Sequence, residues 1–209
     1  MPARQGSILI ENVQPQIDCG RHPVKRAAGE TVRVTADVLK EGHDELAVVL
    51  RWRKLGPQPA EGREMPMRPL GNDAWEGQFP IYEDGLYAFQ VEAWPDSFRT
   101  WAQELSRKVE AGRDVSSELL EGAQLLRAAA ERAAAAGPAG AFDAERLRDG
   151  EKALLGGPSP AALSRALDPR LAEAASRHAD RAVATRTERE RSEERRVGKE
   201  CRSRWSPYH

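Results

Sequence analysis

The sequence is poor in cysteine, in long apolar runs and in net charge, and each shortage excludes a class of protein. Only Cys19 and Cys201 are present among 209 residues, which argues against a disulfide scaffold and favours a reduced, cytoplasmic setting. No run approaches the ~20 apolar residues of a membrane span, and the N-terminus shows no apolar leader. The 32 basic and 33 acidic residues leave a net charge of −1, which disfavours nucleic-acid and membrane-surface partners.

Catalytic motifs are missing as well. The chain contains no Gly-rich phosphate loop, no Ser-His-Asp set and no HExxH segment. We therefore assign no catalytic, cofactor-binding or metal-binding residue to it and expect no cofactor.

The few cysteine and histidine residues do not form a metal site by spacing. Cys19 and His22 are placed like half of one, but no second pair follows, so a small apolar residue beside a loop histidine is the favoured interpretation over zinc. His43 and His178 have no visible acidic or nucleophilic partner in the sequence and are expected on the surface.

Two residue groups are candidates for binding, each beside a simpler structural explanation. A basic loop would suit phosphate or carboxylates, although an ordinary solvated loop is favoured; it comprises Arg21, His22, Lys25 and Arg26. Four tryptophans would suit sugar stacking, although core positions are favoured because they occupy alternating strand positions; these are Trp52, Trp75, Trp94 and Trp101.

The first half alternates apolar and polar residues in short runs separated by Gly, Pro, Asn and Asp. Thr31–Val38 reads TVRVTADV, and Leu46–Leu55 and Leu86–Trp94 are similar runs. About six or seven such strands, with turns every 8–12 residues, predict an immunoglobulin-like β-sandwich over residues 7–96.

From residue 97 the apolar period changes to that of a helix. Trp101, Leu105 and Val109 lie at i, i+4 and i+8. Helix starts are predicted at Asp96 or Ser97, at Ser159 before Pro160, and at Asp168 before Pro169. The last helix is expected to run on to about Thr185. Residues 97–190 are thus predicted to form a helical bundle, giving an α+β protein overall.

The last residues, 191–209, differ in origin from the rest of the chain. RSEERRVGKEC is the in-frame translation of a common sequencing adapter, and the match continues to the end of the chain. A basic nucleic-acid-binding arm and a solvated tail without a role are the alternatives. We favour the adapter, and predict a disordered tail that is not genuine, with the natural chain continuing beyond Glu190.

Two long segments carry a resemblance to a known family. IENVQPQIDCGRHPVKRAAGETVRVTADV and MRPLGNDAWEGQFPIYEDGLYAFQVEAWPDSFRTW resemble the N-terminal region of the bacterial α-1,4-glucan:maltose-1-phosphate maltosyltransferases. DVSSELLEGAQLL and the Ala-rich helices resemble the helical insert that follows. The resemblance covers Ser7 to Glu190, and Pro95 departs from the apolar residue usual there.

The resemblance implies a parent enzyme that transfers maltosyl units from α-maltose 1-phosphate to an α-1,4-glucan and releases phosphate. It implies a retaining mechanism on two carboxyl groups of a glycoside hydrolase family 13 barrel, and that missing barrel would bind both substrates. No residue of this chain matches those groups, so none is carried over.

For the chain itself, the resemblance implies a non-catalytic, structural role in a homodimer. The alternative is a stand-alone carbohydrate-binding module, which exposed and coplanar Trp rings would favour. In the family the helical insert interrupts the sandwich and a final strand follows. Since the chain stops before that strand, an unpaired, aggregation-prone sheet edge is expected.

Overall fold

The chain forms two compact units, one of helices and one of strands. The computed structural model describes residues 8–16, 28–56, 62–187 and 191–194. Ala93–Thr185 and Lys40–Ala47 build the helical unit, and the sheet unit includes Val48–Glu92. The predicted α+β class is confirmed.

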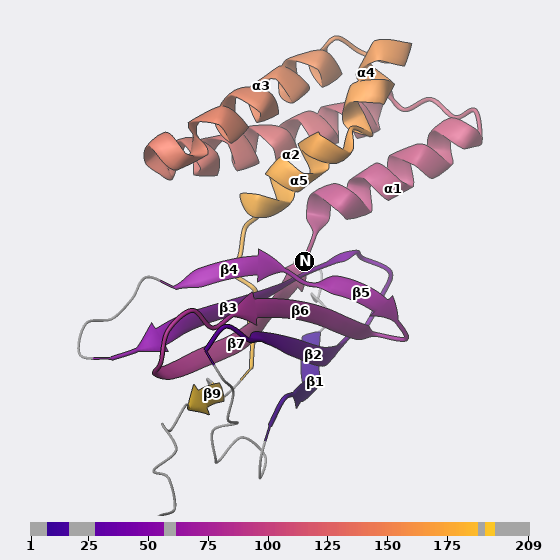
Figure 1. Ribbon diagram of the computed structural model, residues 1–209. Coiled ribbons are helices and arrows are strands. Elements are labelled where there is room, and N and C mark those ends of the chain that lie inside the picture. Colours follow the sequence, from indigo (N-terminus) through magenta and orange to yellow (C-terminus); the bar gives the residue numbers. More distant parts are fainter. Residues whose placement is uncertain (1–7, 17–27, 57–61, 188–190, 195–209) are drawn as a thin grey trace, which may run out of the picture. The chain divides into compact units, whose positions relative to one another are not determined.

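The strands form two antiparallel sheets (Figure 1). The first has the order β1-β2-β6-β5, with bounds Ile8–Gln14, Thr31–Lys40, Ala74–Pro80 and Arg68–Gly71. The second has the order β4-β3-β7-β8, with bounds Arg63–Pro66, Leu46–Leu55, Leu86–Pro95 and Thr185–Arg186. The alternation predicted for β2 is confirmed, because its apolar set is buried: Val32, Val34, Ala36 and Val38.

Phe79 joins the two sheets at the centre of their shared core. It lies on β6 and is fully buried. Its ring stacks on Trp52 of β3, with centroids 5.5 Å apart and planes 19° apart, and it also contacts Tyr87 and Phe89 of β7 at 6.5 and 5.9 Å. A buried aromatic side chain of this size contributes roughly 1.5–3 kcal/mol of hydrophobic stabilisation.

The helices follow β7, and the starts predicted at Asp96, Ser159 and Asp168 are confirmed. They are α1 Ser97–Glu110, α2 Ser116–Ala135, the short 3-10 helix Gly137–Gly140, α3 Ala141–Leu155, α4 Pro160–Ala166 and α5 Pro169–Arg177. Asp96 caps α1 by accepting from the Arg99 amide at 3.0 Å. Ser159 and Asp168 cap α4 and α5 in the same way, each ahead of a proline at the first helical position.

The predicted extension of the last helix to about Thr185 is wrong. α5 ends at Arg177. Three residues later, Asp180 accepts a hydrogen bond from the Ala182 amide at 2.9 Å. A local aspartate–backbone bond of this kind favours a turn over a continued helix.

After the helices the chain returns to the sheet. The edge of β7, which the sequence predicts to be unpaired, therefore has partners. β8 lies beside β7, and β9, Arg191–Glu194, pairs with Leu86–Phe89 of the same strand. The prediction of an unpaired sheet edge is therefore wrong, because residues 185–186 and 191–194 pair with β7. The tail predicted to be disordered begins with this strand, and its remaining residues, 195–209, lie outside the described part of the chain. Among the described helices, none is long and apolar enough to span a bilayer.

Candidate functional site

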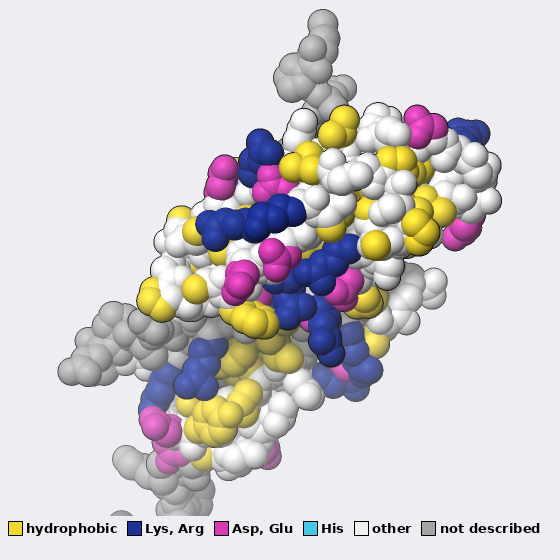
Figure 2. All heavy atoms as spheres, turned by 90° about the horizontal axis from the view of Figure 1, so that it is seen from above, with side chains coloured by type: hydrophobic (Ala, Val, Ile, Leu, Met, Phe, Trp, Pro, Cys, Tyr) yellow, Lys and Arg dark blue, Asp and Glu magenta, His cyan; other side chains and the backbone are white. Residues whose placement is uncertain are grey.

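Charged side chains of both signs lie close together on the surface seen in Figure 2. This mixture matches the nearly balanced composition, with 32 basic and 33 acidic residues. The charges are in large part paired: Arg33 and Arg68 both contact Glu76 on the four-stranded sheet. These two arginines hold the pKa of Glu76 below its ordinary value, chiefly through the Arg68 hydrogen bond.

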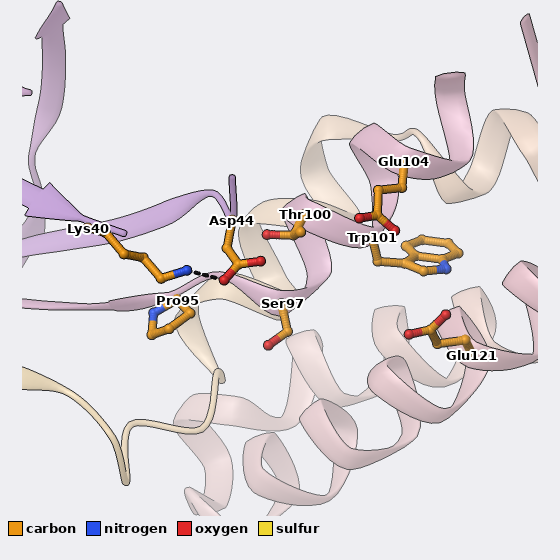
Figure 3. Close-up of a pocket in the computed structure, with 8 residues that line it drawn as sticks. All are labelled: Lys40, Asp44, Pro95, Ser97, Thr100, Trp101, Glu104 and Glu121. Atoms are coloured by element: carbon orange, nitrogen blue, oxygen red, sulfur yellow. Dashed lines mark hydrogen bonds and ion pairs between the residues drawn. The ribbon is translucent and has the colours of Figure 1, made fainter. Parts of the chain in front are cut away.

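A polar pocket of about 280 Å³ lies at the start of α1 (Figure 3). Its lining comprises Lys40, Asp44, Pro95, Ser97, Thr100, Trp101, Glu104 and Glu121. Lys40 pairs with Asp44, and Glu104 and Glu121 bring further carboxylates from α1 and α2. The pocket therefore combines a neutralised ion pair with two acidic groups and the edge of an indole.

The Thr100 hydroxyl of this pocket takes part in a structural hydrogen-bond network. Thr100 Oγ1 donates to the Asp96 carbonyl at 2.9 Å and accepts from the Glu45 amide at 2.9 Å. The Asp96 amide in turn donates to the Glu45 carbonyl at 2.8 Å. This closed network fixes the start of α1 and leaves Thr100 in a structural role rather than that of an activated nucleophile.

A second pocket, of about 200 Å³, is lined by aromatic and charged side chains of the sheet unit. They are Trp52, Arg53, Lys54, Arg63, Pro80, Tyr82, Glu83 and Tyr87. Lys54 Nζ lies 2.6 Å from Glu83 Oε2, and the Arg63 guanidinium lies 5.9 Å from the Tyr82 ring centroid. Gly85 permits the approach of Lys54, because a Cβ atom there would lie 2.7 Å from Lys54 Cε.

The four tryptophans divide into two groups. Trp94 and Trp101 are 1% and 4% exposed, and the Trp101 indole donates to the Glu118 carbonyl at 2.7 Å. These two are core residues. Trp52 and Trp75 are half-buried, so they are not fully enclosed core residues.

Glu92 is a fully buried carboxylate on β7, held by two arginines. Arg51 Nη1 of β3 lies 3.2 Å from its Oε2, and Arg186 Nη2 of β8 lies 2.8 Å from its Oε1. A charge without solvent requires such partners. The sequence did not reveal this cluster, since its members come from three strands far apart in the chain.

Asp143 also has hydrogen-bond partners that the spacing of residues in the sequence did not predict. Arg177 binds it through two bonds of 2.9 and 2.8 Å, and His178 Nε2 lies 3.0 Å from its Oδ2. His178 thus has an acidic partner, contrary to the expectation from its sequence neighbours, because α3 and α5 pack side by side. The Arg177 hydrogen bond, followed by that of His178, lowers the pKa of Asp143 from its ordinary 3.8.

Several predicted candidates lie outside the described residues. These are Cys19, His22 and the basic residues Arg21, Lys25 and Arg26, together with Cys201. His43 is exposed in a bend, as expected. Within the described ranges, no group of three or more His, Cys, Asp or Glu side chains is arranged to hold a metal ion.

Comparison with known proteins gives one consistent result. A model of the family described as alpha-1,4-glucan:maltose-1-phosphate maltosyltransferase, domain N/S, matches residues 6–193. A protein of that name from Myxococcus xanthus is 53% identical over 188 residues, covering 89% of this chain and 28% of the relative. Relatives of the same name from Chlorobaculum tepidum and Salinibacter ruber are 36% and 38% identical, over 85% and 86% of this chain.

The chain spans only about a quarter of the length of these curated relatives. The aligned regions are 28%, 25% and 26% of the three proteins.

Proposed function

This chain belongs to the α-1,4-glucan:maltose-1-phosphate maltosyltransferase family, and from that premise we propose that it is a non-catalytic N-terminal part with a structural role in a dimer. The match to domain N/S over residues 6–193 is the observation that carries the proposal. The alignment of this chain to about a quarter of the length of each relative supports the proposal further.

For the whole protein we propose the activity in the relatives' name. A maltosyl unit would pass from α-maltose 1-phosphate to an α-1,4-glucan, with release of phosphate. The retaining mechanism would use one carboxylate as nucleophile and a second carboxyl group as acid and then base. Both would lie in the part of the relatives that this chain does not cover, and the cysteine content supports a cytoplasmic setting.

We further propose that the sheet unit is an immunoglobulin-like sandwich. In that fold, strands A, B, E and D share one sheet and strands C, F and G share the other. The orders β1-β2-β6-β5 and β4-β3-β7-β8 correspond to ABED and C′CFG. The helices α1 to α5 are then an insertion between strands F and G of the domain that begins at residue 7, and the helical domain predicted as 97–190 also includes strand G at its end.

The dimer proposal is supported by apolar side chains on the four-stranded sheet. Leu9, Leu39 and Leu70 are 50%, 38% and 48% exposed on β1, β2 and β5. All three lie on one sheet, where together they offer apolar surface that a partner molecule can cover. A second copy of the chain would cover them.

Two measurements on the purified chain test these proposals. With α-maltose 1-phosphate and maltoheptaose, we expect no phosphate release above the protein-free rate. Analytical ultracentrifugation should show a dimer that Leu39→Glu dissociates, whereas Leu120→Glu, at a residue 54% exposed on α2, leaves it intact. Phosphate release by the chain alone would overturn the non-catalytic role, and a monomer at all concentrations would overturn the dimer.

The second candidate function is a stand-alone carbohydrate-binding module. The observation that favours it is the pocket beside half-buried Trp52 and exposed Tyr82. The burial of Trp94 and Trp101 removes these two rings from any sugar-stacking surface, whereas Trp75 is half-buried.

A further inference from the structure

The second pocket, in the sheet unit, has more cationic than anionic side chains in its lining. Its cations are Arg53, Lys54 and Arg63, and its one carboxylate is Glu83. We propose that this pocket binds an oxyanion carried on a flat ring, such as an aryl phosphate, and that the ligand displaces Glu83 from Lys54. This ligand class differs from the neutral sugar of the second candidate function, and it does not rest on the activity of the parent enzyme.

Lys54 already binds an anionic group of its own chain. Its Nζ lies 2.6 Å from Glu83 Oε2. The hydrogen bond between the two side chains raises the pKa of Lys54 and lowers the pKa of Glu83, so both are charged at neutral pH. The ammonium group is therefore placed to bind an oxygen anion at this pocket.

Glu83 is an occupant that a ligand can replace. Its side chain is 72% exposed, and an exposed ion pair contributes little to stability. Its main chain is fixed, because the Tyr87 hydroxyl donates to the Glu83 carbonyl at 3.3 Å and accepts from the Glu83 amide at 3.4 Å. The carboxylate can therefore leave Lys54 while the turn keeps its place, and a group with two negative charges attracts the ammonium more strongly than a carboxylate does.

Arg63 supplies a second cation from the neighbouring strand. It lies on β4, in register with Trp52 of β3, and its guanidinium is 5.9 Å from the Tyr82 ring centroid. A guanidinium that faces a ring keeps the N–H donors along its edge, and these donors match the oxygens of a phosphate or carboxylate. Since Lys54 and Arg63 line the same pocket, an oxyanion inside it would meet both.

Tyr82 gives the pocket a preference for the group that carries the oxyanion. Its side chain is 69% exposed, so the ring offers a face on which another flat ring can stack. The volume of about 200 Å³ lies below the range of about 300–1,000 Å³ that is common for small-molecule pockets. These dimensions suit one charged group with a single ring.

The test is a titration of the ¹⁵N-labelled chain with phenyl phosphate at fixed pH and ionic strength, because salt screens exposed charges. Phenyl phosphate should shift amide resonances around Lys54 and Glu83 in a saturable manner. It should bind more tightly than benzoate, which has one charge, than inorganic phosphate, which has no ring, and than phenol, which has no charge. Equal binding of any of these three compounds would overturn the assignment.

Two variants with matched controls test the roles of the charges. Glu83→Gln should strengthen binding by about twofold to fivefold, because it removes the competing carboxylate. Asp84→Asn removes the same charge outside the lining and should give a smaller gain. Arg63→Met should weaken binding by about threefold to tenfold. Its control is Arg146→Met, at an arginine 4.9 Å from the exposed Phe142 ring of the helical unit, which should bind like the unmodified chain.

The proposal fails if phenyl phosphate gives no saturable shift, if Glu83→Gln gains no more than Asp84→Asn, or if Arg63→Met and Arg146→Met lose binding equally. Equal shifts of the same resonances with maltoheptaose would assign the pocket to a neutral sugar instead. None of these results depends on phosphate release or on dimerisation. Failure here is therefore distinguishable from failure of the proposed function.

Discussion

Arg186 and Glu92 are 94 positions apart, and their side chains meet at 2.8 Å. Glu92 is on β7, before all the helices, and Arg186 is on β8, after them. The whole helical segment is thus enclosed between two residues that form one ion pair. The sheet unit obtains the second arginine partner of its buried carboxylate, after Arg51 of β3, only when the chain returns from the helices.

The first prediction concerns the loss of this partner. Arg186→Met leaves Glu92 fully buried with Arg51 alone, at 3.2 Å. We expect the free energy of unfolding of the sheet unit to fall by about 1–3 kcal/mol, since a buried charge loses a hydrogen bond. Urea unfolding followed by tryptophan fluorescence measures it.

The matched control for that variant is Arg33→Met. Glu76 would keep Arg68, and Arg33 is 67% exposed, so the expected cost is at most about 1 kcal/mol. Equal losses of unfolding free energy in the two variants would show that the burial of Glu92 does not make its ion pair more stabilising than the exposed pair of Arg33.

The second prediction concerns the packing of α1 on α2. A Cβ atom at Gly122 would lie 2.1 Å from Cζ2 of buried Trp101. Gly122→Ala should therefore destabilise the helical unit by about 1–3 kcal/mol, although the same change at an open helical position stabilises by about 0.5–1 kcal/mol. Thermal unfolding followed by circular dichroism shows whether Gly122→Ala raises or lowers the stability of the helical unit.

Gln124→Ala, at an exposed position of the same helix, serves as the control and should stay within about 0.5 kcal/mol of the unmodified chain. A Gly122→Ala chain that melts higher than this control would contradict the close contact with Trp101.

The third prediction follows from the lowered pKa of Asp143. Because the folded pKa lies below the ordinary 3.8, the carboxylate stabilises the fold above that value. This stabilisation is lost as the pH falls from 3.8 through the lowered pKa. Asp143→Asn should cost about 1 kcal/mol at neutral pH, reduced by the exposure of Arg177, and the difference should vanish in acid.

The measurement is urea unfolding of both chains at several pH values. Asp149→Asn is the comparison, since Asp149 is 56% exposed and lies 3.9 Å from Lys152; it should cost little at neutral pH. A difference between Asp143→Asn and the unmodified chain that persists unchanged in strong acid would contradict the stabilising role of the carboxylate.

Local patterns in the sequence predicted the elements well, and long-range contacts were the part they missed. Alternation predicted β2, and the caps at Asp96, Ser159 and Asp168 predicted three helix starts, because these signals act within a few residues. The contact of Asp143 with His178 depends on packing between helices. The pairing of β9 with β7 depends on where the chain returns, which no local pattern specifies.

The last prediction concerns that return. A chain that ends at Ala184 lacks β8, β9 and Arg186, so it uncovers the edge of β7 and removes a partner of Glu92. Each lost backbone bond, such as that from the Thr187 amide to the Val91 carbonyl at 3.0 Å, removes about 0.5–1.5 kcal/mol. The loss should therefore exceed that of Arg186→Met, and light scattering should show aggregation through the bare edge.

A chain that ends at Glu194 keeps both strands and should match the full chain in stability and scattering, because residues 195–209 belong to the segment 191–209 that is predicted to be a disordered tail. Arg186→Met in the full chain removes the charged partner of Glu92 but keeps β8 and β9. It therefore separates the effect of the lost charge from the effect of the uncovered edge of β7. If the chain ending at Ala184 unfolds at the same urea concentration as the one ending at Glu194, then β8 and β9 do not stabilise the sheet. The sheet unit would in that case be complete at β7, and the helices would form an extension of it rather than an insertion.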